Sequence, residues 1–197
     1  MIWVLGAAYC IGSIPFAMML ARRWGSADLR RLGSGNVGAT NVLRAYGVTP
    51  GVIVAVLDMA KGAASVWLAG QFGAAGASTA YAGLAAIVGH VFPVWTGFRG
   101  GKGVATACGV FSVLAPPAAL TAFGAFIVTV WVSRYVSLGS LVASLTLPPA
   151  VYATGSAPPA IAAACAAAAL IVVRHRTNVM RLLTGTERRV GYRERLS

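Results

Sequence analysis

Long apolar runs alternate with short polar connections along this chain. Three such runs cover residues 2–21, 50–68 and 78–95. Each is about as long as a helix that crosses a bilayer, which needs about 20 residues. The first run carries no basic residue at its start, so we interpret it as a span and not as a cleaved signal segment. Pro15 is expected to kink it.

Two further apolar regions, residues 104–132 and 138–173, are interrupted near their middles. The interruptions are Pro116–Pro117 in the first region and 155–159 in the second. Single crossings in both regions would give five spans, and double crossings would give seven. Length alone leaves both counts open, because two crossings within 104–132 would be unusually short.

Composition and charge decide between these counts. The chain of 197 residues is 58% hydrophobic and only 10% charged, which is typical of a polytopic membrane protein. Apart from Lys61, every basic residue falls in four places, which are 22–44, 99–102, 134 and 174–195. Seven spans put all four on one side, as the positive-inside rule requires. We therefore predict an all-α protein of one domain, 1–197, with seven transmembrane helices, the N-terminus outside and the C-terminus cytoplasmic.

Nucleic acid is not an expected partner. The net charge of +12 is explained by the gathering of basic residues on one side of the membrane.

The stretch Leu32–Tyr46 gathers glycines with hydroxyl and amide side chains. Its polar and glycine residues are Gly33, Ser34, Gly35, Asn36, Gly38, Thr40 and Asn41, followed by Arg44. Glycine-rich loops that open a helix present backbone N–H groups to anions, and arginine suits phosphate oxygens. The sequence therefore predicts a phosphate-binding loop here, although polar helix caps between spans would look similar. A short capped interfacial helix is expected just before it, at 26–31.

A second glycine loop, Gly97–Thr106, follows the third run. It contains Gly100, Gly101, Lys102 and Gly103 and opens a helix at Val104. The nucleotide-binding pattern G-x-x-x-x-G-K-[ST] is not met, since Gly103 stands where serine or threonine is required, so the ATPase interpretation fails. An anion loop with one lysine remains. His90 precedes it and is either a packing residue or part of the site.

Two other groups of polar residues interrupt the apolar pattern. Asp58 and Lys61 lie three apart within the second span, where each charge costs about 2.5–3.5 kcal/mol. They either neutralise each other or face a polar cavity. His175, Asn178 and Arg181 fall on one stripe of an amphipathic helix after the last run. The final basic residues, 188–195, are expected to bind lipid headgroups.

Metal chemistry is not indicated. The three cysteines lie in apolar runs, and the four acidic residues, Asp28, Asp58, Glu187 and Glu194, do not cluster. An alcohol phosphatidyltransferase, which needs metal-binding aspartates, is therefore a poor match. We expect no metal and no cofactor.

Four segments, in this order, closely resemble the bacterial acyl-phosphate:glycerol-3-phosphate acyltransferase family, PlsY. They are SGNVGATN with Arg44, DMAKG, GHVFPVWTGFRGGKGVAT and RHRTNVMRLLTGTE. The resemblance implies a seven-span enzyme of the bacterial inner membrane with its active site at the cytoplasmic face. It implies transfer of a fatty acyl group from acyl phosphate to the 1-hydroxyl of glycerol 3-phosphate. The products would be lysophosphatidic acid and inorganic phosphate, in the first acylation of phospholipid synthesis.

The roles that we expect follow from the two anionic substrates. Ser34, Asn36, Thr40, Asn41 and Arg44, with Gly35 and Gly38, would surround glycerol 3-phosphate or the transferred phosphate. Lys102 and the amides of Gly100, Gly101 and Gly103 would hold a second phosphate. His175 and Asn178 would contact the acceptor glycerol or the reacting carbonyl. Lys61 and His90 would contact ligand or support the residues that do. Ser140, in the short segment SLGS, resembles a family segment but is generic. Ser34, Lys102, His175 and Asn178 are the candidate catalytic residues.

The expected partners are glycerol 3-phosphate, long-chain acyl phosphate and membrane lipid, and the enzyme that makes acyl phosphate is a candidate partner. The H-x-x-x-x-D pair of soluble glycerophosphate acyltransferases is absent, since Trp95 and Met180 stand where the aspartate would follow His90 and His175. A small transporter of a phosphorylated metabolite is the alternative function. Against it, the chain shows no internal repeat and its polar residues gather on one side.

Overall fold

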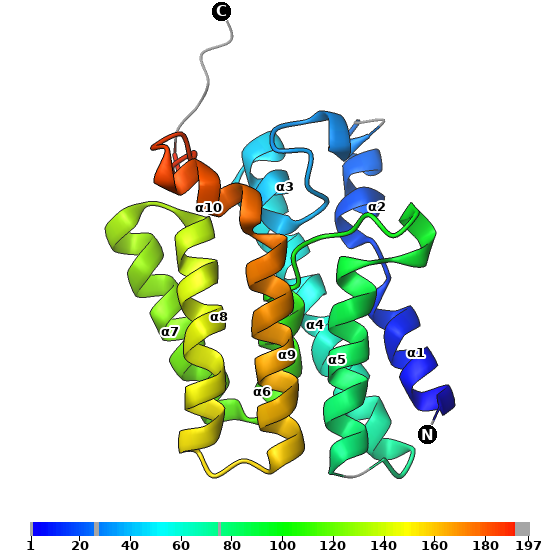
Figure 1. Cartoon of the computed structure of the whole chain (residues 1–197). Helices are drawn as coiled ribbons and strands as arrows, with labels where there is room; N and C mark the ends of the chain where they lie inside the picture. The colour runs from blue at the N-terminus through cyan, green and yellow to red at the C-terminus, as the bar shows by residue number, and fades with distance from the viewer. Residues whose placement is uncertain (1, 26–27, 75, 192–197) are drawn as a thin grey trace, which may run out of the picture.

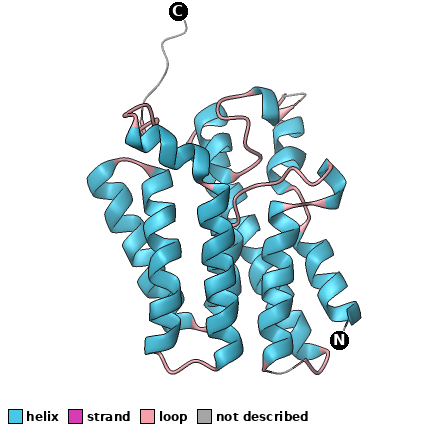
Figure 2. Cartoon of the chain, in the orientation of Figure 1, coloured by secondary structure: helices cyan, strands magenta, loops and turns pink. Residues whose placement is uncertain are grey.

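Helices make up all the regular secondary structure in the described part of the chain (Figure 2). The computed structural model describes residues 2–25, 28–74 and 76–191. The longer helices are α1 (Ile2–Gly12), α4 (Val48–Gln71), α5 (Ala77–Val91), α6 (Val104–Leu114), α7 (Pro116–Ser133), α8 (Val136–Ala153) and α9 (Pro158–Arg174). The shorter ones are α2 (Phe16–Arg23), α3 (Ala39–Tyr46), α10 (Arg176–Leu183) and the 3₁₀ turns η1 (Leu29–Arg31) and η2 (Val94–Thr96). The all-helical prediction is confirmed.

Within the described residues, five helical segments are long and apolar enough to cross a membrane. They are Ile2–Arg23, Val48–Gln71, Ala77–Thr96, Pro116–Ser133 and Val136–Ala153. Helices α9 and α10 would make a sixth if they are taken together, although they are bent by 57°. Helix α6 is apolar but has only 11 residues. By length and composition, the described residues therefore contain five candidate spans, or six with the bent pair.

Proline sets the breaks that the sequence predicted. Helices α1 and α2 are separated at Ser13–Pro15, because proline has no N–H to donate. Helix α7 begins at Pro116 and α9 begins at Pro158, the position where a missing N–H costs nothing. Both interrupted apolar regions are therefore helix pairs.

The connections that carry basic residues gather at one end of the bundle (Figure 1). At this end lie α2, α3, the loop that precedes α6, the connection between α7 and α8, and α10. The connections α4–α5, α6–α7 and α8–α9 lie at the opposite end, as does the start of α1. We call the first end the basic end. It is where all the predicted anion-binding segments meet.

Helix α6 is short because the glycine loop before it enters the bundle. A Cβ on Gly103 would contact Ile87 and Val91 of α5 and Ile171 of α9, so this residue lies between those helices. Below it, α4 and α6 pack backbone to backbone, since a Cβ on Gly109 would collide with the Met59 carbonyl. Such close packing of small residues is how helices associate in lipid. As a result, the first turn of α6 opens inside the bundle.

The segment before α3 differs in detail from the expected helix at 26–31. A 3₁₀ turn, Leu29–Arg31, begins after Asp28, whose Oδ1 accepts a hydrogen bond from the Arg30 N–H at 3.0 Å. Residues 26 and 27 of the expected helix lie outside the described residues. The cap in the described part is Asp28, and aspartate commonly caps helices through such a carboxylate–amide bond.

Candidate active site

A cavity of about 250 Å³ opens near the basic end and runs between α3, α4, α6, α7, α8 and the junction of α9 with α10. Its wall is polar near the basic end and apolar farther along α6, α7 and α8. The apolar wall is formed by Phe111, Ala119, Ala122, Phe123, Phe126 and Leu147. A ligand with an anionic head and a hydrocarbon tail would match both parts.

Asn41 organises the first glycine loop. Its Oδ1 accepts hydrogen bonds from the N–H of Ser34 at 2.9 Å and from the Ser34 hydroxyl at 3.2 Å. Its Nδ2 donates to the carbonyls of Leu29 (3.2 Å) and Leu32 (2.9 Å). Gly33 adopts a left-handed backbone (φ 57°), and a Cβ there would collide with Asn41 Oδ1. Asn41 lines the cavity, but its amide is engaged in holding this loop in place.

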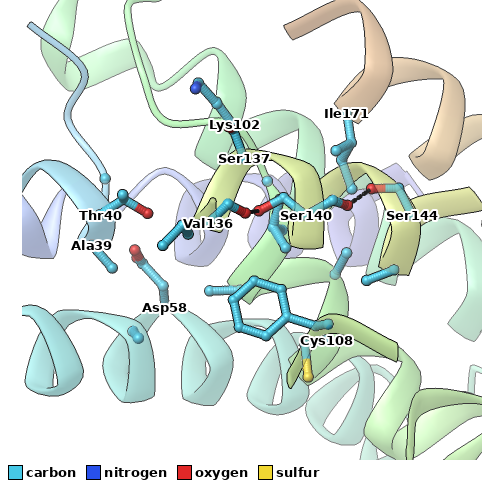
Figure 3. Close-up of a pocket in the computed structure, with 18 of the residues that line it drawn as sticks. Ala39, Thr40, Asp58, Lys102, Cys108, Val136, Ser137, Ser140, Ser144 and Ile171 are labelled. Carbon is cyan, nitrogen blue, oxygen red and sulfur yellow. Dashed lines mark hydrogen bonds between the residues drawn. The ribbon is translucent and has the colours of Figure 1, made fainter. Parts of the chain in front are cut away.

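Helix α3 presents Thr40 and Arg44 to the cavity, since residues four apart share a helical face. Arg44 Nη2 lies 3.6 Å from Glu187 Oε1 and donates to the Arg188 carbonyl at 3.3 Å. In Figure 3 the side chains of Thr40 and Asp58 point toward one another, Thr40 from α3 and Asp58 from α4. The cavity therefore has a cation at its mouth and a carboxylate deeper inside.

Glu187 is the centre of a buried polar network. Its Oε1 accepts from Ser137 Oγ at 3.0 Å and Asn178 Nδ2 at 3.0 Å, and its Oε2 accepts from Arg181 Nε at 2.7 Å. Burial raises the pKa of this carboxyl, but the hydrogen bonds outweigh burial, so the net pKa lies below its ordinary value. At neutral pH Glu187 is therefore ionised and ties α8, α10 and Arg44 together at the cavity mouth.

Lys102 reaches the same network from the second glycine loop. Its Nζ donates to Asn178 Oδ1. Burial lowers the pKa of Lys102 to about 8, which the nearby Glu187 charge opposes. The guanidinium groups of Arg181, Arg44 and Arg174 act in the same direction as burial and contribute to that value. The ammonium group therefore sits among other cations, where an added phosphate would be attracted.

The amides of Gly100 and Gly101, which the sequence predicts to bind an anion, donate to backbone carbonyls in this structure. Gly100 N–H donates to the Val91 carbonyl and Gly101 N–H donates to the His90 carbonyl, both at 3.1 Å. The loop therefore folds back onto the end of α5. The N–H groups of the first turn of α6, just after Gly103, have no acceptor within their own helix. They are the amides that this loop offers to an anion.

His175 and Asn178 come from the bend between α9 and α10. His175 Nδ1 lies 2.8 Å from the Ile171 carbonyl, which can only accept, so this nitrogen carries the proton. Nε2 is then left as the acceptor nitrogen of a neutral ring. Both residues are buried and line the cavity, as the helical spacing predicted. Arg181, the third residue of that stripe, binds Glu187 instead.

The structure brings most of the predicted residues together. Those that line the cavity are Ser34, Asn36, Gly38, Thr40, Asn41, Arg44, His90, Lys102, Gly103, Ser140, His175 and Asn178. Gly35, Lys61, Gly100 and Gly101 do not line it. Gly35 forms a turn, with its N–H on the Leu32 carbonyl at 3.0 Å. Lys61 turns toward the α1–α2 break, where its Nζ donates to the Ile14 carbonyl at 2.8 Å. These four residues therefore lie outside the cavity wall, and their contact with ligand stays a prediction.

Four cavity residues with hydroxyl or carboxylate side chains were not among the predicted site residues: Asp58, Ser137, Ser144 and Glu187. Ser137, Ser140 and Ser144 lie along α8 (Figure 3), and their spacing of three and then four residues is a helical face that the sequence already contains. The Ser140 hydroxyl donates to the Val136 carbonyl at 2.9 Å, and that of Ser144 donates to the Ser140 carbonyl. Asp58 carried a signal as an intramembrane charge. Glu187 is a single acidic residue in a basic segment, and no sequence pattern singled it out as a site residue.

Comparisons with known proteins agree with this geometry. The family profile described as Glycerol-3-phosphate acyltransferase matches residues 2–185. The chain belongs to the glycerol-3-phosphate acyltransferase family. A family member from Brucella suis is 48% identical over 184 residues, which cover 93% of this chain and 90% of that protein. One from Synechococcus sp. strain CC9902 is 44% identical over 188 residues, covering 95% and 94%.

Two solved structures of the family share the fold. Both are PlsY, an integral membrane glycerol 3-phosphate acyltransferase. The glycerol 3-phosphate form has a TM-score of 0.91 at 42% identity, and the lysophosphatidic acid form has a TM-score of 0.89 at 41% identity. Each comparison covers 96% of this chain and 95% of the other. The resemblance inferred from the four sequence segments is confirmed, and the transporter alternative is not favoured.

Proposed function

We propose that this protein transfers a fatty acyl group from acyl phosphate to the 1-hydroxyl of glycerol 3-phosphate. The observation that carries the proposal is one cavity with a cationic, amide-rich mouth and an apolar extension between membrane helices. The two related PlsY structures, in glycerol 3-phosphate and lysophosphatidic acid forms, support the acceptor and the product.

The donor is argued from the chemistry of the cavity hydroxyls. Ser34 donates to Asn41 Oδ1, Ser137 donates to Glu187, and the hydroxyls of Ser140 and Ser144 donate to carbonyls of their own helix. A serine nucleophile needs a general base, and the lowered pKa of Glu187 makes that carboxylate a weak one. An acyl phosphate carries a good leaving group and requires no acyl-enzyme. Direct transfer between two bound substrates is therefore the mechanism that we favour.

In that step the glycerol hydroxyl oxygen attacks the acyl carbonyl carbon. The bond between this carbon and the phosphate oxygen breaks, phosphate leaves with the electron pair, and the hydroxyl proton passes to a phosphate oxygen. Arg44 and Lys102 would neutralise the phosphates, helped by the amides at the start of α6. Ser34, Asn36 and Thr40 would orient the glycerol 3-phosphate. His175 and Asn178 would contact the acceptor or the reacting carbonyl.

The same proposal places the protein in the bacterial inner membrane. Seven crossings would be formed by α1–α2, α4, α5, α6, α7, α8 and α9. The entering glycine loop would complete the short crossing of α6. The basic end would face the cytoplasm, with the N-terminus outside and the C-terminus inside. The acyl chain would come from the bilayer or from the enzyme that makes acyl phosphate.

Phosphate release from palmitoyl phosphate by the purified protein, with and without glycerol 3-phosphate, tests the proposal. Release that requires the acceptor, with lysophosphatidic acid formed in equal amount, is the expected result. Release without acceptor would contradict direct transfer and indicate an acyl-enzyme or hydrolysis. Product formation from an acyl thioester but not from acyl phosphate would overturn the proposed donor. No product with either donor, in folded protein, would overturn the proposed reaction.

A further inference from the structure

Three buried ionisable side chains lie together on α4 and α5, and two of them, Asp58 and His90, line the cavity. Asp58 and Lys61 are on α4 and His90 is at the end of α5, with side-chain exposures of 3%, 3% and 7%. Asp58 Oδ1 lies 2.8 Å from Lys61 Nζ and 3.5 Å from His90 Nδ1. A charge inside a membrane helix is costly and calls for a specific reason.

The break between α1 and α2 accounts for Lys61. Its ammonium donates to the Ile14 carbonyl at 2.8 Å, in the segment where proline removes a helical donor, and lies 5.7 Å from the centre of the Phe16 ring. The same carbonyl accepts the Phe16 N–H at 3.1 Å, so the Lys61 ammonium is a second donor to the backbone at the break and ties α4 to it. Asp58 neutralises that cation, yet it also faces the cavity and His90. A carboxylate that only neutralises Lys61 would not need to face the cavity or to lie beside His90.

His90 connects Asp58 to the loop that carries Lys102. Its carbonyl accepts the Gly101 N–H at 3.1 Å, and its ring fills the space beside the Gly101 Cα. A Cβ on Gly101 would collide with Nε2 and lie 2.8 Å from Cε1 of that ring. The orientation of the imidazole therefore limits where Gly101 can lie, and Lys102 is the next residue.

We propose that Asp58 is a positioning residue for Lys102. Anchored by Lys61, its carboxylate fixes the His90 ring, and the ring fixes the Gly100–Gly103 loop so that the Lys102 ammonium reaches Asn178 in the cavity. The proposal rests on the proposed role of Lys102 in binding phosphate. It assigns a role to a carboxylate that does not itself have to touch substrate.

The test is Asp58→Asn, which keeps the shape of the side chain and removes its charge. We expect the KM for glycerol 3-phosphate to rise about tenfold or more, with a smaller change in kcat. We also expect the alkaline limb of kcat/KM to move up by about half a pH unit or more, because a loosened loop returns Lys102 to water and toward its ordinary pKa. Loss of a negative charge alone would move that limb down, so the sign distinguishes displacement from simple electrostatics.

Ser65→Ala is the matched control, because Ser65 is buried on the same helix one turn beyond Lys61, bonds only its own helix in this structure and lies outside the cavity. This variant is expected to have the wild-type KM for glycerol 3-phosphate, and the alkaline limb of its kcat/KM is expected at the wild-type pH. If Asp58→Asn does not fold, His90→Gln must show the same KM rise and upward shift. In the double variant Asp58→Asn, His90→Gln, the rise in KM must be smaller than the two single effects combined, because both substitutions act through the His90 ring.

An unchanged KM and limb in either folded single variant would overturn the positioning role. Lys102→Ala separates this outcome from failure of the proposed function. If Lys102→Ala is inactive while Asp58→Asn behaves as wild type, only the positioning proposal fails. If Lys102→Ala is itself fully active, the proposed phosphate site fails first.

Discussion

At the scale of single residues, Lys102 takes its properties from its surroundings. Burial lowers its pKa to about 8, so the ammonium form is lost in a range where an exposed lysine would stay charged. Only the charged form can attract phosphate. The protonated state is present below that pKa and declines as the pH rises through it.

We therefore predict that kcat/KM for glycerol 3-phosphate falls as the pH rises through about 8. Lys102→Ala should lower kcat/KM by about 100-fold or more at neutral pH and remove this limb, because one charge-stabilising group is lost. Initial rates across the pH range, with acyl phosphate in excess, measure both effects. A variant that retains the limb would show that another group titrates there.

Gly101 offers a second prediction at this scale. Gly101→Ala places a Cβ against the His90 ring, so the loop or the ring must move. Transfer activity should fall by at least about tenfold, given that small displacements at a reacting site have large effects on rate. Gly124→Ala on α7 is the matched control, since a Cβ there meets no atom within 4 Å. Equal activity of the two variants would show that the loop tolerates displacement.

At the scale of elements, the contact between α4 and α6 decides how deep the second glycine loop enters. A Cβ on Gly62 would collide with the Thr106 carbonyl and lie 3.1 Å from Val110 N. Both neighbours are backbone atoms, which cannot rotate away. The two helices can therefore approach this closely only with glycine at this position.

Gly62→Ala should destabilise the protein by about 1–3 kcal/mol, the usual cost of overpacking. Gly70→Ala, two turns farther along the same helix, meets nothing within 4 Å and should be neutral or slightly stabilising. Thermal unfolding of both variants in the same detergent gives the comparison. A smaller loss for Gly62→Ala than for Gly70→Ala would contradict the packing described for α4 and α6.

At the scale of the whole molecule, the basic connections share one end and the uncharged connections share the other (Figure 1). Thr184 follows α10 at the basic end, Ala157 precedes α9 at the opposite end, and both residues are exposed. In an active background without Cys10, Cys108 and Cys165, we predict that Thr184→Cys is labelled by an impermeant thiol reagent only in inside-out vesicles. Ala157→Cys should be labelled only in right-side-out vesicles. Labelling of both from one side would overturn the seven-crossing orientation.

The sequence by itself determined the helices, their breaks and the clustering of the site segments. Apolar length, Pro15, Pro116 and Pro158 locate the spans, because lipid demands helices and proline interrupts them. The basic connections separate from the uncharged ones in the sequence alone. His175 and Asn178 were found from helical spacing, and the four family segments identified the family. Local rules of hydrogen bonding and charge are sufficient for these features.

Only the tertiary structure decided which groups face the cavity. It turns Lys61 toward Ile14 and leaves Asp58 at the cavity wall, although both lie on one face of α4. It engages the Gly100 and Gly101 amides with α5, and it makes Glu187 the centre of a network that spans α3, α8 and α10. These contacts join residues up to 144 positions apart, as Arg44 and Arg188 are. They depend on how helices pack against each other, and no periodicity along one helix encodes that.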